Sequence, residues 1–381
     1  MYEKLMSVGS RIEGVTLYLV NVDDMRKFSF GVWRNRQHVF AVVRTRNCAG
    51  YGENIISVNT PDIPLDEWKA HSRVFKGLTV GQAIRRLRTE RDSWDCHYVE
   101  MLEMALIDLA GKELGCPAMS LFGFDDYANV DGVFVILDDD PEHVRALARE
   151  AAGSGMSKIV KVKLFGDEGL DLAIVESVRS VLSRTDTLLI GDVNTGYGRE
   201  GEAADICAVS QTLRRLYDAG LDGCEDPAFL SVKQWTELQS MVDPLSLIPD
   251  YILRPSRRAI ATVQSGMGKV FNIHPGSAGS VIDAIELARH IRAFGGELMV
   301  GDDSLIGPAC TVWQQIAMVF RARWVEAVEK PRDSSFFRSC IVSINTDSLS
   351  NPVTYEPKTG GFGLILDEER LSAGCLSRAE V

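Results

Sequence analysis

The middle of the chain repeats one pattern, in which a short apolar run ends in a carboxylate and a helical segment follows. The three carboxylates are Asp192, Glu225 and Asp250, and the helical segments are 168–182, 203–219 and 232–241. A (β/α) barrel uses this order of elements to place metal-binding side chains at the carboxyl ends of its strands. One such carboxylate is more often a helix N-cap or a turn residue. Three in succession favour a shared site.

Strand and helix patterns alternate regularly from residue 131 onward. Eight runs are strand candidates: 132–137, 159–164, 188–192, 223–225, 246–250, 270–274, 297–300 and 339–344. Eight is the number of strands that a closed barrel needs. We therefore predict an α/β fold with a (β/α) barrel over residues 129–355.

The residues before the barrel follow a different plan. Residues 10–60 alternate as strands and residues 65–115 are helical, which predicts a compact α+β unit over residues 1–128. The tail, 356–381, comes too late in the chain to belong to the barrel. A chain of 381 residues can hold two such domains.

Lys161 and Lys163 lie in the strand that precedes the first of the carboxylates. Two residues apart on a strand, their side chains project from the same face. Paired ammonium groups lower each other's pKa, so that one of them can be neutral and act as a general base. On a solvated edge strand the same spacing would carry no function. The carboxylates that follow favour a buried site.

Composition excludes several classes of partner. A formal net charge of -12 argues against nucleic acid and anionic membranes, but not against a small anionic substrate. The eight cysteines are widely and irregularly spaced, as reduced cytosolic thiols are. The amino terminus lacks a signal-peptide pattern, and no apolar run reaches the roughly 18 residues of a membrane span. We expect a soluble, cytoplasmic protein.

Several motifs occur in a characteristic order along the chain. They are Gly50-Tyr-Gly-Glu53, the segment 103–112, Lys161-x-Lys163, the three carboxylates, and Asp303-Ser-Leu-Ile-Gly307. In this order the chain resembles the enolase superfamily, in its muconate-lactonizing and mandelate-racemase-like branch, over nearly its whole length. The resemblance implies that residues 1–128 cap the barrel, that the tail returns to this capping domain, and that the protein forms a symmetric assembly.

The resemblance also implies Mg²⁺ held by Asp192, Glu225 and Asp250, with a substrate carboxylate completing the coordination. Mg²⁺ prefers such hard oxygen ligands. A divalent cation stabilises the charge that develops when a proton alpha to a carboxylate is removed. A Lys or His base paired with Mg²⁺ is the superfamily's known arrangement. Tyr251 stands where a Glu is common after the third ligand, which makes Asp250 the least secure of the three.

By the same resemblance, Lys163 is the base on one face of the substrate. Lys161 would depress the pKa of Lys163 and help to bind the carboxylate. Asn194 shares the strand parity of Asp192, and it either orients a ligand or substrate oxygen or is a turn residue.

The residues expected on the opposite face of the substrate depart from the pattern of the muconate-lactonizing branch. His274 occupies the position of a lysine at the end of the sixth strand, and Ser280 replaces a glycine. Imidazole can accept or donate a proton near neutral pH, so His274 is a candidate for the second catalytic group. Asp303, or its neighbour Asp302, is a candidate for substrate contact or for supporting His274.

Substrate recognition is expected from a loop over residues 26–36 that closes over the barrel mouth. Trp33, Arg34 and Arg36 are its candidates for contact with an apolar or anionic distal group. The alternative is that these residues are plain loop surface.

The leading functional hypothesis is a dehydratase of a hydroxy acid that works through an enolate. A racemase, epimerase or cycloisomerase would use the same proton abstraction, and His274 suits either outcome. A non-catalytic descendant that only binds a ligand is a second alternative. The intact lysine pair and the three carboxylates argue against it, because a binding role has no need for costly buried charge.

Overall fold

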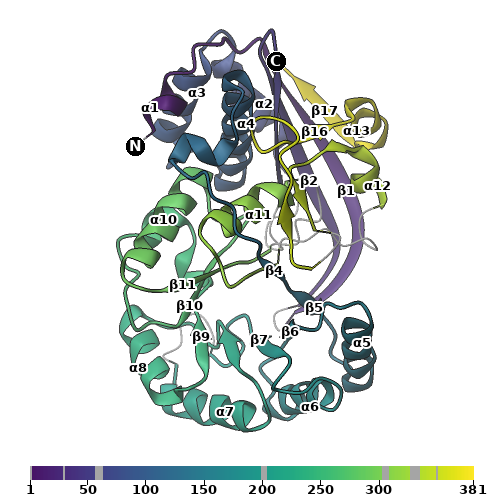
Figure 1. The fold of residues 1–381 in the computed structure, drawn as a ribbon, viewed down its shortest axis with the longest axis vertical. Helices are drawn as coiled ribbons and strands as arrows, with labels where there is room; N and C mark the ends of the chain where they lie inside the picture. Colours follow the sequence, from purple (N-terminus) through teal and green to yellow (C-terminus); the bar gives the residue numbers. More distant parts are fainter. Residues whose placement is uncertain are drawn as a thin grey trace.

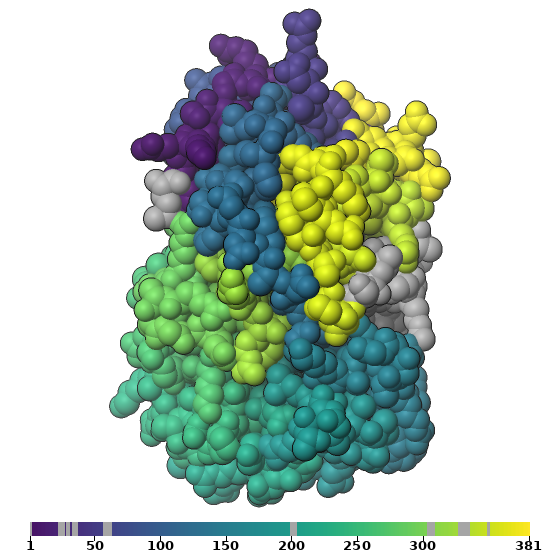
Figure 2. All heavy atoms as spheres, in the orientation of Figure 1, coloured from purple at the N-terminus to yellow at the C-terminus, as the bar shows by residue number. Residues whose placement is uncertain are grey.

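The structure is a computed structural model of the chain. It describes residues 2–28, 31–55, 63–198, 204–302, 309–326, 335–348 and 351–381. The barrel lies in the lower part of Figure 1, and above it a second domain joins the two ends of the chain. The space-filling view shows the same sharing, with amino-terminal (purple and blue) and carboxyl-terminal (yellow) residues side by side (Figure 2). No helix in these ranges is long and apolar enough to span a membrane.

Two parallel sheets make up the barrel. The first runs in the order β5 (Phe134–Ile136), β6 (Ile159–Lys163), β7 (Leu188–Asp192), β8 (Gly223–Glu225) and β9 (Ser246–Ile248). The second runs β10 (Val270–Ile273), β11 (Glu297–Val300), β12 (Trp324–Val325) and β4 (Asp131–Gly132). β9 contacts β10, and one residue separates β4 from β5, so the sheets join into a ring of eight positions. The predicted fold class is confirmed.

Helices follow the strands on the outside of the ring. They are α5 (Pro141–Gly153), α6 (Glu168–Arg179), α7 (Ile206–Asp218), α8 (Val232–Val242), α9 (Ser256–Ala259), α10 (Val281–Ala293) and α11 (Cys310–Val319). Five of these helices begin with an Asp or Ser whose side chain accepts a backbone N–H of the first turn: Asp140, Asp167, Asp205, Ser231 and Ser280. Such caps stop each strand-to-helix loop at a defined residue.

The eighth strand differs from the prediction. The ring closes through β12, whereas the predicted run 339–344 begins in helix α12 (Ser335–Cys340) and continues as β13 (Ile341–Ser343). β13 pairs antiparallel with β16 (Ile365–Leu366), outside the barrel. Phe337 and Cys340 pack in a separate core with Tyr18 and Phe40 of the amino-terminal sheet. The apolar pattern of this run therefore serves the upper domain.

The upper domain is built on an antiparallel sheet in the order β17-β1-β2-β3. Its strands are β1 (Gly14–Phe28), β2 (Gly31–Arg44), β3 (Ala49–Ile55) and, from the end of the chain, β17 (Ser377–Glu380). Helices α1 (Glu3–Met6), α2 (Leu65–Ser72), α3 (Val80–Glu90) and α4 (Cys96–Leu114) complete it. Short strands β14 (Thr346–Asp347) and β15 (Thr354–Tyr355) and helix α13 (Glu368–Gly374) lead to β17.

Strand β3 lies unusually close to helix α4. A Cβ at Gly50 would fall 2.1 Å from the carbonyl oxygen of Ala105, and one at Gly52 would fall 2.1 Å from that of Met101. No side chain fits in that space, which explains the spacing Gly-Tyr-Gly in the motif. Below this contact, Asp108 of α4 accepts the backbone N–H groups of Tyr51 (3.1 Å) and Phe362 (2.8 Å), so one buried carboxylate ties β3 and the tail to the helix.

The expected capping loop is instead a β-hairpin. β1 continues to Phe28 and β2 starts at Gly31, with a register shift between Asp23 and Arg26. Lys27 near its tip donates a hydrogen bond of 2.6 Å to Asp139 in the loop after β5, so the hairpin reaches the rim of the barrel. The backbone of Trp33, Arg34 and Arg36 lies in β2, but their side chains fall outside what the structure describes.

Candidate active site

The predicted lysines and two of the carboxylates meet at the carboxyl ends of β6, β7 and β8. Lys163 is paired in register with Asp192, and Asp192 with Glu225, so the three residues stand at one level of the ring. All five residues of β6 are buried, and Lys161 and Lys163 are only 6% and 5% exposed. Strand parity puts both lysines on one face, as their spacing predicts, and their ion pairs with Asp192 and Glu225 show that this face carries the site.

Ion pairs link these side chains into one network. Lys161 Nζ lies 2.8 Å from Glu225 Oε2 and 3.4 Å from Asp192 Oδ2. Lys163 Nζ donates a hydrogen bond of 2.8 Å to the same oxygen of Asp192. Asp192 thus bridges the two lysines.

Lys161 is surrounded by carboxylates, whereas the sequence predicted only the repulsion between the two ammonium groups. Burial lowers its pKa, but the charges of Glu225, Glu326 and Asp192 outweigh burial and hold the pKa well above its usual value. The neighbouring carboxylates thus favour the ammonium form of Lys161, the form that an anion-binding group needs.

Glu326 was not among the predicted site residues. It follows β12, is 4% exposed, and its Oε1 lies 2.8 Å from Lys161 Nζ. The sequence signal was present, since Trp324-Val-Glu326 repeats the apolar-run-plus-carboxylate pattern of the other strands. The eighth strand was predicted in the wrong segment, and its terminal carboxylate was missed with it.

Buried carboxylates outnumber cations among the described residues at this end of the barrel. The carboxylates are Asp192, Glu225, Asp226, Asp250 and Glu326, and the cations are Lys161, Lys163 and Arg254.

The surplus of negative charge appears in the pKa values of the carboxylates. Burial and the charges of Asp192 and Glu326 outweigh Lys161 and raise the pKa of Glu225 to about 7. Burial and the charge of Glu225 raise that of Asp226 to about 8. Asp192 is the exception: burial opposes ionisation, but Lys163 and Lys161 lower its pKa to about 2.

Asp250 is engaged differently from the other two predicted ligands. Arg254, one turn further on, binds both of its carboxylate oxygens, with Nε 2.9 Å from Oδ1. The ligand oxygens of Asp192, Glu225 and Asp250 do not all lie within 4.8 Å of one another in the described chain. The donor set fits a hard divalent cation, and its excess negative charge favours one. Asp192 and Glu225 are held by Lys161, Lys163 and Asn272, and Asp250 is held by Arg254.

His274 lies just beyond β10, 8% exposed. Its Nδ1 lies 2.8 Å from the carbonyl oxygen of Pro275 and 3.1 Å from Ser277 Oγ. A carbonyl oxygen only accepts, so Nδ1 carries the proton and the lone pair is on Nε2, 4.0 Å from Asp250 Oδ2. Burial, together with the charges of Arg254 and Lys161, lowers the pKa of His274 well below its usual value.

The remaining predicted residues have varied outcomes. The backbone N–H of Asn194 donates to Asp192 Oδ1 at 3.1 Å, and its φ of 46° places it in a left-handed turn, which favours the turn alternative. The Nδ1 of His274 is supported by the carbonyl oxygen of Pro275, and the described contacts of His274 do not include Asp302. Asp303 lies outside the described residues. Asn272 on β10 was not predicted; its amide donates to Glu225 Oε1 at 3.1 Å.

A cavity of about 280 Å³ adjoins this network. Its lining includes Thr195, Asp226, Phe229, Trp235 and Tyr251. Asp226, one of the buried carboxylates of the network, is part of this lining, so the cavity borders the charged side chains.

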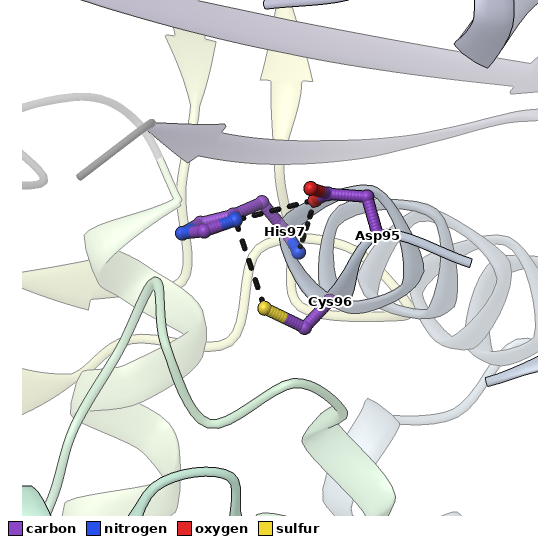
Figure 3. Close-up of side chains that lie close together, drawn as sticks. All are labelled: Asp95, Cys96 and His97. Atoms are coloured by element: carbon purple, nitrogen blue, oxygen red, sulfur yellow. Dashed lines mark hydrogen bonds and ion pairs between the residues drawn. The ribbon is translucent and has the colours of Figure 1, made fainter. Parts of the chain in front are cut away.

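A separate group of ligand-type side chains lies at the start of α4, where Asp95, Cys96 and His97 approach within 4.8 Å (Figure 3). Asp95 Oδ1 accepts the backbone N–H groups of His97 (2.8 Å) and Tyr98 (3.3 Å) and lies 3.2 Å from His97 Nδ1. Burial alone would lower the pKa of His97, but its hydrogen bond with Asp95 raises it to about 11. The cluster is thus a helix cap held by an internal ion pair.

The curated relatives of the chain include epimerases, a racemase, a cycloisomerase and a dehydratase. No protein-family model matches the sequence. L-Ala-D/L-Glu epimerase from Bacteroides thetaiotaomicron is 30% identical over 203 residues, 52% of this chain and 48% of that protein. N-succinylamino acid racemase from Thermus thermophilus is 26% identical over 308 residues, 76% of this chain and 78% of that protein. Cis-3-hydroxy-L-proline dehydratase from Roseibium aggregatum is 33% identical over 109 residues, 29% of each chain. The chain spans about half the length of the first of these relatives.

Solved structures match over almost the whole chain. N-succinyl Arg/Lys racemase from Bacillus cereus has a TM-score of 0.80 at 19% identity, covering 97% of this chain and 100% of that one. A dipeptide epimerase from Cytophaga hutchinsonii, complexed with Mg and D-Ala-L-Val, gives the same values. An enolase from Bradyrhizobium, complexed with magnesium and mandelic acid, has a TM-score of 0.74 at 18% identity, covering 97% and 100%. The chain therefore shares the fold of these racemase, epimerase and enolase structures.

Two features set this chain apart from the pattern that its motifs imply. His274 stands where the muconate-lactonizing branch carries a lysine. Arg254 binds a carboxylate that was expected to be a metal ligand. Both features belong to the β9–β10 side of the barrel, which faces Lys163 across the ring.

Proposed function

We propose that the protein is an isomerase, a racemase or epimerase that moves the proton alpha to a substrate carboxylate. One observation carries the proposal: Lys163 ends β6 and His274 follows β10, four positions apart in a ring of eight. Side chains on opposite walls of a barrel address opposite faces of a molecule held between them. Inversion of a carbon centre needs one group to remove the proton and another to return it on the other face.

The hydrogen bonds of His274 and Lys163 fit one direction of this reaction. His274 Nε2 holds a lone pair and would remove the proton, while Lys163, as an ammonium group hydrogen-bonded to Asp192, would return a proton to the other face. In the reverse direction the two residues exchange roles. Lys161 would stay charged throughout and hold the substrate carboxylate.

Asp192 and Glu225 would hold a divalent cation, for which Mg²⁺ is the candidate, and Asp250 would join them if Arg254 released it. When bound, the cation would offset the surplus carboxylate charge and stabilise the charge that develops on the substrate carboxylate. The Mg in the dipeptide epimerase structure supports this choice.

The substrates to try first are dipeptides and N-acylated amino acids, because the names of the epimerase and racemase relatives specify them. Dehydration of a hydroxy acid, the leading hypothesis from the sequence, is the second candidate. It has one partial match in its favour and would use the same proton abstraction, with His274 protonating the departing hydroxyl.

Proton NMR in D₂O with Mg²⁺ and each enantiomer of these substrates tests the proposal. We expect the alpha proton to exchange for deuterium with either enantiomer, and the opposite enantiomer to accumulate. Lys163→Ala and His274→Asn should each lower inversion by about 10²- to 10⁴-fold, since each removes one general acid–base group. Each variant should keep exchange with only one enantiomer, and the two variants should keep opposite ones.

Lys233→Ala, at an exposed position on α8, is the matched control and should leave every rate unchanged. Loss of water without inversion would favour the dehydratase. If exchange with both enantiomers survives in Lys163→Ala, the proposed base is wrong.

A further inference from the structure

His274 is carried by a loop, residues 275–280, that leads from β10 to α10. Pro275 and Ser277 of this loop both contact its Nδ1. Two glycines of the loop, Gly276 and Gly279, have φ angles of 82° and 77°, in the left-handed region. The direction of the imidazole ring therefore depends on the path of the loop backbone.

A carboxylate from the other domain holds this loop. Glu100 lies on α4, is fully buried, and uses one oxygen for each glycine. Its Oε1 accepts the backbone N–H of Gly276 at 2.7 Å, and its Oε2 accepts that of Gly279 at 2.8 Å. Bonds from N–H groups to a buried carboxylate are short, strong and directional, so both ends of the turn are fixed at once.

We propose that Glu100 is a positioning residue for His274. It bridges two domains and sets the orientation of the imidazole through the backbone of residues 276–279 without touching the substrate. This role rests on the proposed function. It adds that the upper domain orients His274, the catalytic group on one face of the substrate. Lys163 ends β6, four strand positions around the ring from β10, and its hydrogen bond goes to Asp192 on the neighbouring strand.

Glu103, one turn further along α4, is the natural comparison. Its Oε2 accepts Ser280 Oγ at 2.6 Å and the backbone N–H of Ile282 at 3.0 Å. It therefore binds the first turn of α10 and not the segment that contacts His274. Glu100 and Glu103 are both buried carboxylates of α4 that bind the barrel, and they differ in which part they bind.

The test is the exchange rate of the alpha proton, measured separately for each enantiomer in Glu100→Gln and Glu103→Gln. A glutamine at position 100 keeps one acceptor and replaces the other with an NH₂ group, which releases one end of the turn. Exchange on the His274 face should fall at least tenfold, because displacement of a catalytic group by about 1 Å can cost 10²-fold. Exchange on the Lys163 face should stay within about twofold of wild type.

Glu103→Gln should lower the melting temperature, but it should slow the two faces equally. Hydrogen–deuterium exchange of the backbone provides a readout that does not need turnover: in Glu100→Gln, faster exchange should be confined to residues around 274–280. If Glu100→Gln is too unstable to assay, Ser277→Ala removes one contact to Nδ1 and should also slow only the His274 face.

Equal slowing of both faces in Glu100→Gln, or none, would overturn the positioning role while the proposed function stands. A wild-type protein that exchanges neither enantiomer would overturn the proposed function itself. In that case local backbone exchange still decides whether Glu100 holds the loop.

Discussion

Arg254 is the residue that most affects how the site can bind a cation. It takes both oxygens of Asp250, the third predicted metal ligand, and its positive charge stands beside the cation's expected position. Arg254→Met should therefore strengthen Mg²⁺ binding by about tenfold, which corresponds to about 1.4 kcal/mol. Isothermal titration calorimetry with Mg²⁺ measures it directly.

Arg258→Met, which removes an exposed arginine from α9, is the control and should leave Mg²⁺ affinity unchanged. Weaker Mg²⁺ binding in Arg254→Met would mean that Arg254 orients Asp250 for the cation instead of competing with it.

For the site residues, the sequence predicted which side chains come together more reliably than it predicted which hydrogen bonds and ion pairs each of them makes. Strand parity and the register of neighbouring strands suffice to bring Lys163, Asp192 and Glu225 together. The bond from Arg254 to Asp250 and the support of His274 by Pro275 depend on loop conformation, which alternation does not encode. The charge of Lys161 depends on all neighbouring carboxylates, including one from a strand that was misplaced.

Strand β3 packs so closely against helix α4 that no side chain fits at its two glycines. Gly52→Ala would put a Cβ 2.1 Å from the carbonyl oxygen of Met101, a backbone atom that cannot rotate away. We expect a loss of about 3 kcal/mol or more in the free energy of unfolding, at the upper end of overpacking effects. Urea denaturation followed by circular dichroism measures this loss.

Gly153→Ala is the matched control, because a Cβ at this end of α5 meets no atom within 4 Å. It should be neutral or stabilise the protein by up to about 1 kcal/mol. A Gly52→Ala protein as stable as wild type would show that β3 and α4 can separate without cost.

The longer barrel strands were easier to predict from the sequence than the shortest one. Runs such as 188–192 stand out because all of their residues are apolar or small up to the carboxylate. The eighth strand, β12, has two residues, and the longer apolar run at 339–344 was chosen in its place. That run is apolar because it covers the upper sheet, and periodicity alone does not tell which of two cores a segment will join.

The molecule as a whole joins two domains over the open end of the barrel. Besides the bonds of Glu100 and Glu103, Glu53 of β3 accepts the backbone N–H of Ala309 at 3.0 Å, just before α11. Lys27 of the hairpin binds Asp139 on the barrel rim. Hydrogen bonds between the two domains therefore surround the charged network at the barrel mouth. The ionisation of this network should affect the stability of the whole protein.

Two carboxylates of that network predict how stability depends on pH. Glu225 and Asp226 titrate at about 7 and 8 in the folded chain, whereas unfolded carboxylates titrate near about 4. Between these values the folded state binds more protons than the unfolded state, so the free energy of unfolding falls as the pH rises. The lowered pKa of His274 makes the free energy of unfolding rise with pH, but only below about pH 6.5, where the imidazole of the unfolded chain would be charged. The clear window is therefore pH 6.5 to 8.

In this window the metal-free protein should lose on the order of a few kcal/mol of stability, seen as a falling melting temperature in calorimetry with EDTA. Saturating Mg²⁺ should remove most of the fall, because a divalent cation offsets the charge of the ionised carboxylates. His97, with a pKa of about 11, contributes a fall of the same sign that Mg²⁺ would leave in place. Asp226→Asn should flatten the metal-free profile. A melting temperature that is constant or rises between pH 6.5 and 8 without metal would contradict the raised pKa values, and with them the argument that the barrel mouth carries uncompensated negative charge.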